Sequence, residues 1–141
     1  FFQAMRRDMA AHWLLFVAEY EGQAIGISLI GLHLDAAGQP EVAYGRYWGA
    51  LIDAEHLHFE LCYYQGIEYC IRHGLRYYDA GAQGEHKLKR GFEPVRRYGS
   101  YLFAETLLSG AITAYFQQET EHLKAYSAAA MQALPYKKYN G

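Results

Sequence analysis

The sequence predicts an α/β domain with a mixed, mostly antiparallel β-sheet flanked by helices. Three strand-like segments come first, short glycine-containing turns join them, and a clear helix leads to a fourth strand-like segment. The chain has 141 residues, of which 52% are hydrophobic and 20% charged. This composition excludes a disordered chain, and this length is enough for one domain with its own hydrophobic core.

The first half of the chain predicts an antiparallel meander. Residues 1–10 are typical of the end of a helix. Strands are predicted over residues 12–20 and 24–34, joined by a turn at Glu21–Gln23, and a turn at residues 35–40 leads to a third strand over residues 41–48. The many β-branched and aromatic side chains in these segments suit a pleated surface.

Residues 54–73 predict the clearest helix. Its apolar side chains recur at helical spacing in two neighbouring rows, and Gly74 stands where a C-cap belongs. A strand over residues 75–78 follows, then a glycine-rich loop and another strand over residues 95–103. A long helix from about residue 105 to 133, broken near Gly110, is expected to close the chain.

Charge and cysteine content narrow the class of protein. The net charge of −2 gives no general reason to expect nucleic acid. Cys62 and Cys70 lie eight residues apart on one predicted helix, about 12 Å at helical rise, which is too far for a disulfide. Reduced thiols, no membrane-spanning run and no visible signal peptide together predict a cytoplasmic protein. The chain opens in mid-pattern without Met, so we expect a fragment of something longer.

The segment Asp79–Pro94 is the strongest candidate for chemistry. Gly81, Gly84 and Gly91 frame Gln83 and a run of acidic, imidazole and basic side chains: Glu85, His86, Lys87, Lys89 and Arg90. Glycine allows a backbone to turn sharply and approach a ligand closely. Basic side chains beside exposed backbone N–H groups suit an anion or a carbonyl oxygen.

Acyl transfer to an amine needs two kinds of group, and this loop contains both. Glu85 or His86 could accept the proton of the attacking nitrogen, and a lysine could stabilise the oxyanion. The alternative is a solvated loop whose glycines only make turns. Neither cysteine has an evident basic partner, so no covalent enzyme intermediate is expected.

A second candidate lies on the third predicted strand. By period two, Tyr44, Arg46 and Trp48 are expected on one face, where a stacked guanidinium could bind a carboxylate or phosphate. A structural cation–π cluster explains the same residues equally well. Arg96 is a candidate phosphate contact, or simply part of a solvated strand edge.

The predicted helix adds one weaker candidate. Glu60 lies among aromatic residues, and a partly buried acid there could pair with Arg46 or Lys89. His58 and Cys62 are four residues apart, but no third ligand stands at matching spacing. We therefore expect no metal site. Asp79 ends its strand, where it could cap loop N–H groups or orient the loop lysines.

Three segments carry a family resemblance: Tyr44–Gly49, His58–Glu68 and Gly81–Pro94. They resemble the signature of the FemAB-like predicted N-acyltransferases, a branch of the GNAT superfamily related to the Fem-type peptidoglycan aminoacyltransferases. The resemblance implies a GNAT-like fold in which residues 1–141 form a single domain, the C-terminal half of a longer protein. It also implies a lysine near the reacting acyl group, with Lys89 in best register and Lys87 second.

The resemblance implies transfer of an acyl or aminoacyl group to a small-molecule or peptide amine in cell-wall peptide metabolism. The segment Trp48–His56 lacks the usual Gln/Arg-x-x-Gly-x-Gly/Ala pyrophosphate loop. Aminoacyl-tRNA or another donor is therefore favoured over acyl-CoA, though the cofactor is left open. The alternative is a non-catalytic ligand-binding half that needs a missing N-terminal half or a homodimer to complete its cleft.

Overall fold

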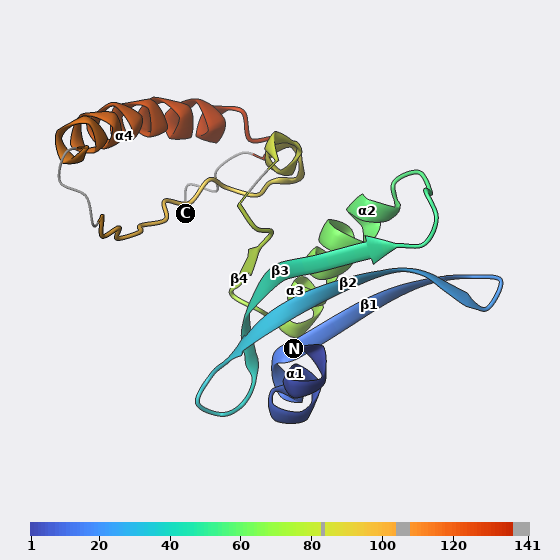
Figure 1. Cartoon of the computed structure of the whole chain (residues 1–141). Coiled ribbons are helices and arrows are strands. Elements are labelled where there is room, and N and C mark those ends of the chain that lie inside the picture. Colours follow the sequence, from blue (N-terminus) through green and yellow to red (C-terminus); the bar gives the residue numbers. More distant parts are fainter. Residues whose placement is uncertain (83, 104–107, 137–141) are drawn as a thin grey trace. The chain divides into compact units, whose positions relative to one another are not determined.

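The computed structural model describes residues 1–82, 84–103 and 108–136 of the chain. It divides into two compact units, Phe1–Gln83 and Gly84–Gly141 (Figure 1). The boundary between them falls inside the glycine-rich loop. No helix of the described residues is long and apolar enough to cross a membrane.

The first unit is built on a four-stranded sheet in the order β1-β2-β3-β4. The strands are β1 (Trp13–Tyr20), β2 (Gln23–Leu34), β3 (Pro40–Ala50) and β4 (Tyr77–Asp79). β1–β2 and β2–β3 pair antiparallel, and β3–β4 pair in parallel. The predicted mixed, mostly antiparallel sheet is therefore confirmed. Glu21 and Gly22 both have positive φ, 51° and 76°, as the tight β1–β2 hairpin requires.

One continuous helical stretch covers one face of this sheet, which we call the inner face (Figure 1). It comprises α2 (Leu57–Phe59), a π-helical turn (Glu60–Tyr64) and α3 (Gln65–His73). The helix predicted over residues 54–73 is thus confirmed from Leu57 onward. Gly74 adopts the left-handed conformation at φ 67°, and the amide of Leu75 donates to the Cys70 carbonyl at 2.9 Å, which confirms the predicted C-cap.

The core lies between the inner face and α3. It consists of Ile30, Leu32, Ala43 and Cys70, with partly buried apolar side chains around them. Burial raises the pKa of the Cys70 thiol to about 11, so this cysteine is held as a neutral thiol.

Tyr78 anchors β4 to the helical stretch. Its hydroxyl donates to the Cys62 carbonyl at 2.5 Å, within the π-helical turn, where the regular helical hydrogen-bond ladder is interrupted. Gly66 leaves the space for this ring: a Cβ there would lie 2.6 Å from Cε1, Cζ and Oη of Tyr78. Burial is the main reason that the pKa of Tyr78 is raised.

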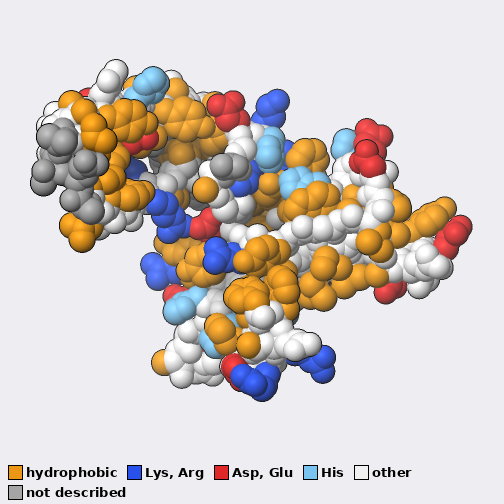
Figure 2. Space-filling model, in the orientation of Figure 1, with side chains coloured by type: hydrophobic (Ala, Val, Ile, Leu, Met, Phe, Trp, Pro, Cys, Tyr) orange, Lys and Arg blue, Asp and Glu red, His pale blue; other side chains and the backbone are white. Residues whose placement is uncertain are grey.

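The opposite, outer face of the sheet is largely open. Helix α1 (Phe2–Asp8) packs beside it, with the ring centroids of Phe2 and Tyr47 5.9 Å apart. Four apolar side chains of this face remain 43–51% exposed: Leu15, Val17, Ile27 and Tyr47. Figure 2 shows hydrophobic side chains gathered over the long strands.

The second unit contains a 3₁₀ helix (Glu85–Arg90) and α4 (Ser109–Gln132). The strand predicted over residues 95–103 is wrong, because these residues form neither helix nor strand. A strand is stable only against a partner, and no described segment pairs with these residues. The predicted start of the last helix near residue 105 lies outside the described residues. Among the described residues the helix begins at Ser109, next to Gly110, and it runs to Gln132.

Candidate functional site

The side chain of Asp79, at the start of the glycine-rich loop, caps a backbone N–H group of that loop. Asp79 Oδ1 accepts a hydrogen bond from the amide of Gly81 at 2.8 Å. Asp79 stands beside Tyr44 in the parallel β3–β4 ladder, so both side chains lie on the outer face. Of the two roles considered for Asp79, capping of a loop N–H group is the one the structure confirms. Gln83 lies outside the described residues.

The basic part of the loop is a 3₁₀ helix between two glycines with positive φ. Gly84 precedes it at φ 107° and Gly91 follows it at φ 85°. A Cβ on Gly84 would overlap the imidazole ring of His86, so glycine at this position gives the ring its place. The glycines thus position side chains here as well as turn the chain.

Helical geometry separates the two base candidates. Side chains three residues apart eclipse in a 3₁₀ helix, so His86 shares a face with Lys89, and Glu85 shares one with Leu88. Lys89 and Glu85 are exposed, whereas His86 and Lys87 are half-buried. His86, and not Glu85, therefore lies on the same face of this helix as Lys89.

A β-bulge changes the arrangement predicted for β3. Leu29 pairs with Tyr47 and Ile30 pairs with Gly45, which leaves Arg46 without a partner on β2. The alternation therefore shifts by one residue at Arg46. Trp48, opposite Ser28, lies on the inner face, while Tyr44 and Arg46 lie on the outer face. The prediction that these three side chains share one face is wrong.

Glu60 differs from its prediction too. It is exposed rather than partly buried, and it accepts a hydrogen bond from Gln65 Nε2 at 2.7 Å. It is the first residue of the π-helical turn. Arg96 is exposed in the irregular segment before α4. The described residues hold no cluster of three metal-binding side chains.

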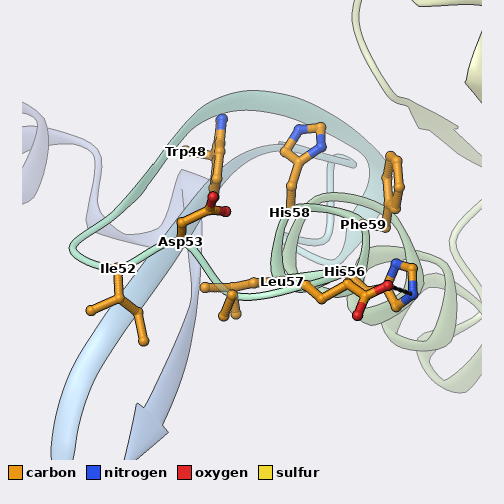
Figure 3. Close-up of a pocket in the computed structure, with 9 residues that line it drawn as sticks. Trp48, Ile52, Asp53, His56, Leu57, His58 and Phe59 are labelled. Carbon is orange, nitrogen blue, oxygen red and sulfur yellow. Dashed lines mark ion pairs between the residues drawn. The ribbon is translucent and has the colours of Figure 1, made fainter.

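An inner-face pocket of about 360 Å³ lies between the end of β3 and the start of α2 (Figure 3). The rings of Trp48, His58 and Phe59 point to the same side of it, and the centroids of Trp48 and His58 are 4.7 Å apart. Glu55 pairs with His56 at 3.2 Å, with both side chains strongly exposed. The lining contains two carboxylates and no lysine or arginine: Trp48, Ile52, Asp53, Ala54, Glu55, His56, Leu57, His58 and Phe59.

A second pocket, of about 340 Å³ and on the outer face, is lined by basic rather than acidic side chains. It contains one arginine, two histidines and no carboxylate among its lining residues: Met9, His12, Trp13, Gly31, Leu32, His33, Tyr44 and Arg46. Gly31 forms its floor, since a Cβ there would lie 3.5 Å from Trp13 Cζ3 and 3.9 Å from Arg46 Cγ. Sequence reasoning found Tyr44 and Arg46 but missed His12, Trp13 and His33, which only the pairing of β1, β2 and β3 brings beside them.

The fold and these sites define an α/β protein with a pocket on each face of a mixed sheet. A model of the FemAB-like family, described as peptidoglycan biosynthesis/recognition, matches residues 1–138. The chain belongs to this family. No match was found among the curated proteins compared with it.

A comparison with solved structures finds the ribosomal-protein-alanine N-acetyltransferase from Brucella melitensis biovar Abortus 2308. It is 12% identical, with a TM-score of 0.49, over 74% of this chain and 78% of that chain.

Proposed function

We propose that this chain is an N-acyltransferase or aminoacyltransferase domain that acts on an amine, with peptidoglycan peptides as the acceptor class. Membership of the FemAB-like family, over residues 1–138, is the observation that carries this proposal. We further propose a cytoplasmic location, where activated acyl donors are made.

The glycine-framed 3₁₀ helix supplies the chemistry in this proposal. The acceptor amine attacks the carbonyl carbon of a bound thioester or ester, and the carbon–sulfur or carbon–oxygen bond breaks. Lys89 stabilises the oxyanion of the tetrahedral intermediate, and His86, on the same face, takes the proton from the amine nitrogen. That proton leaves with the departing thiol or hydroxyl. Lys87, half-buried on a different face, is the second choice for the oxyanion.

The inner-face pocket supports a donor other than acyl-CoA. It occupies the segment where the resemblance would place a pyrophosphate loop, and Asp53 and Glu55 line it without a lysine or arginine. A diphosphate would meet like charge there. Aminoacyl-tRNA, which presents its acyl group as an ester and whose phosphates would lie outside this pocket, is the proposed donor.

The decisive experiment measures acyl transfer by the full-length protein. Acetyl-CoA and a panel of aminoacyl-tRNAs are offered as donors, with UDP-linked muropeptides as acceptors. Lys89→Met is expected to lower kcat by about 100-fold, the usual effect of losing one oxyanion donor. Lys124→Met, an exposed lysine on α4, is the matched control. Unchanged transfer in Lys89→Met would refute the assignment, and preference for acetyl-CoA would overturn the proposed donor.

The open sheet surface favours a second candidate, a ligand-binding half-domain completed by a partner half or a second copy. Leu15, Val17 and Ile27 stay 51%, 43% and 44% exposed on the outer face. Surfaces of this kind commonly mark an interface. Light scattering of the isolated chain tests it: a dimer, or binding of muropeptides without any transfer by the full-length protein, would favour this candidate.

A further inference from the structure

We propose that the outer-face pocket binds a small molecule carrying both a carboxylate and an amine, with Arg46 holding the carboxylate and His12 the amine. Assigning this molecule to the acyl acceptor rests on the proposed function. The binding itself does not.

Arg46 is the cation of this site. It lines the pocket from the β3 bulge, and no residue of the pocket lining carries a negative charge. The neighbouring acid of the outer face, Asp79, accepts from the amide of Gly81. Arg46 makes no ion pair with a carboxylate of the described residues. A guanidinium in this setting matches an incoming carboxylate in both charge and planar geometry.

His12 supplies a group of a different kind. Its Nδ1 lies 3.2 Å from the carbonyl oxygen of Leu32. A carbonyl can only accept, so Nδ1 carries the hydrogen, and in the neutral ring Nε2 is left with a lone pair. That lone pair can accept a hydrogen bond from an amine N–H. The pocket therefore combines one group for an anion with one for an amine.

The size of the pocket limits the ligand. At about 340 Å³ it stands at the lower end of the roughly 300–1,000 Å³ typical of small-molecule sites. A free amino acid fits this space better than a whole nucleotide. A single permanent cation also suits the single charge of a carboxylate better than the nearly double charge of a phosphate monoester.

Tryptophan fluorescence can follow occupancy of this pocket. The chain has two tryptophans, and Trp13 lines the outer-face pocket while Trp48 lines the other. In the Trp48→Phe background, Trp13 is the sole indole. The probes are glycine, β-alanine, 4-aminobutyrate and 6-aminohexanoate, which increase the separation of amine and carboxylate. Glycinamide, butyrate and inorganic phosphate are the comparison compounds.

We expect a saturable change in fluorescence with at least one amino acid of the series, about tenfold tighter than with butyrate or glycinamide. Arg46→Gln should abolish it. Arg72→Gln, an exposed arginine on α3, is the matched control and should bind as the parent does. Gly31→Val should abolish binding by filling the floor of the pocket. His12→Gln can still donate to the Leu32 carbonyl and should reduce amino-acid binding to the level of the plain carboxylate.

The inference would be overturned by the absence of a saturable change with any amino acid, or by binding that survives both Arg46→Gln and Gly31→Val. Phosphate binding more tightly than every amino acid would refute the carboxylate assignment. Circular dichroism of each variant confirms that it is folded. Because this assay needs no turnover, its failure is separable from that of the proposed function, which the Lys89→Met activity decides.

Discussion

Replacing Gly66 with alanine should loosen the attachment of β4 to the helical stretch. The added Cβ would lie 2.6 Å from three atoms of the Tyr78 ring. Carbon atoms normally pack about 3.5–4.0 Å apart, so the ring and the helix must separate by about 1 Å. That movement breaks the 2.5 Å hydrogen bond from Tyr78 to the Cys62 carbonyl.

The expected loss of stability in Gly66→Ala is the sum of opposing effects. Overpacking typically costs about 1–3 kcal/mol and a lost hydrogen bond about 0.5–1.5 kcal/mol, while alanine in place of glycine within a helix returns about 1 kcal/mol. We expect Gly66→Ala to lower the free energy of unfolding by about 1–3 kcal/mol. Urea unfolding followed by tryptophan fluorescence reports on this unit, since it contains both tryptophans.

Gly49→Ala is the matched control, because no atom lies within 4 Å of the Cβ position at Gly49. It should leave the urea midpoint nearly unchanged. In the Gly66→Ala background, Tyr78→Phe should cost less than it does in the parent, because the hydrogen bond has already been lost. A Gly66→Ala variant as stable as the Gly49→Ala control would refute the reasoning.

Three further predictions follow from the cap, the buried thiol and the loop glycine. Gly74→Ala should destabilise the first unit by about 1 kcal/mol, seen as a lower urea midpoint, because residue 74 is held at φ 67°. The folded state raises the pKa of Cys70 from 9.0 to about 11, so stability should be intact below pH 9 and fall as pH rises toward 11. Cys70→Ala should make the loss of stability between pH 9 and 10 less steep. This window lies below the ordinary tyrosine pKa of 10.0, above which tyrosines of the unfolded chain lose their protons. An unchanged dependence of stability on pH in Cys70→Ala would contradict the cause given. Gly84→Ala should displace the His86 ring and lower acyl transfer, whereas an unaltered His86 NMR signal would contradict the packing described.

Local sequence signals were sufficient to predict most of the helices, strands and turns of the first unit. The Glu21–Gly22 turn and the Gly74 cap depend on backbone conformations that glycine makes accessible, so their positions could be read directly. The three long strands and the main helix follow from turns and periodicity in the same way. These features need no knowledge of what lies next to them.

Features that depend on a neighbour could not be predicted in this way. The bulge at Arg46 exists only in the pairing of β3 with β2, and period two along one strand contains no trace of it. The exposure of Glu60 depends on which side of the helix meets the sheet. The irregular course of residues 95–103 likewise reflects a missing pairing partner among the described residues and not a change in composition.

The bulge has a consequence for how β3 could have acquired its chemistry. If Arg46 were deleted, Gly45 and Tyr47 would become neighbours and the β2–β3 ladder would run without interruption from Gly26 to His33, with Trp48 still facing Ser28. Arg46 is thus the one residue of this stretch that the sheet does not need for pairing. A single inserted residue adds a charged side chain to one surface while leaving the opposite surface as it was, so the two pockets can diverge independently.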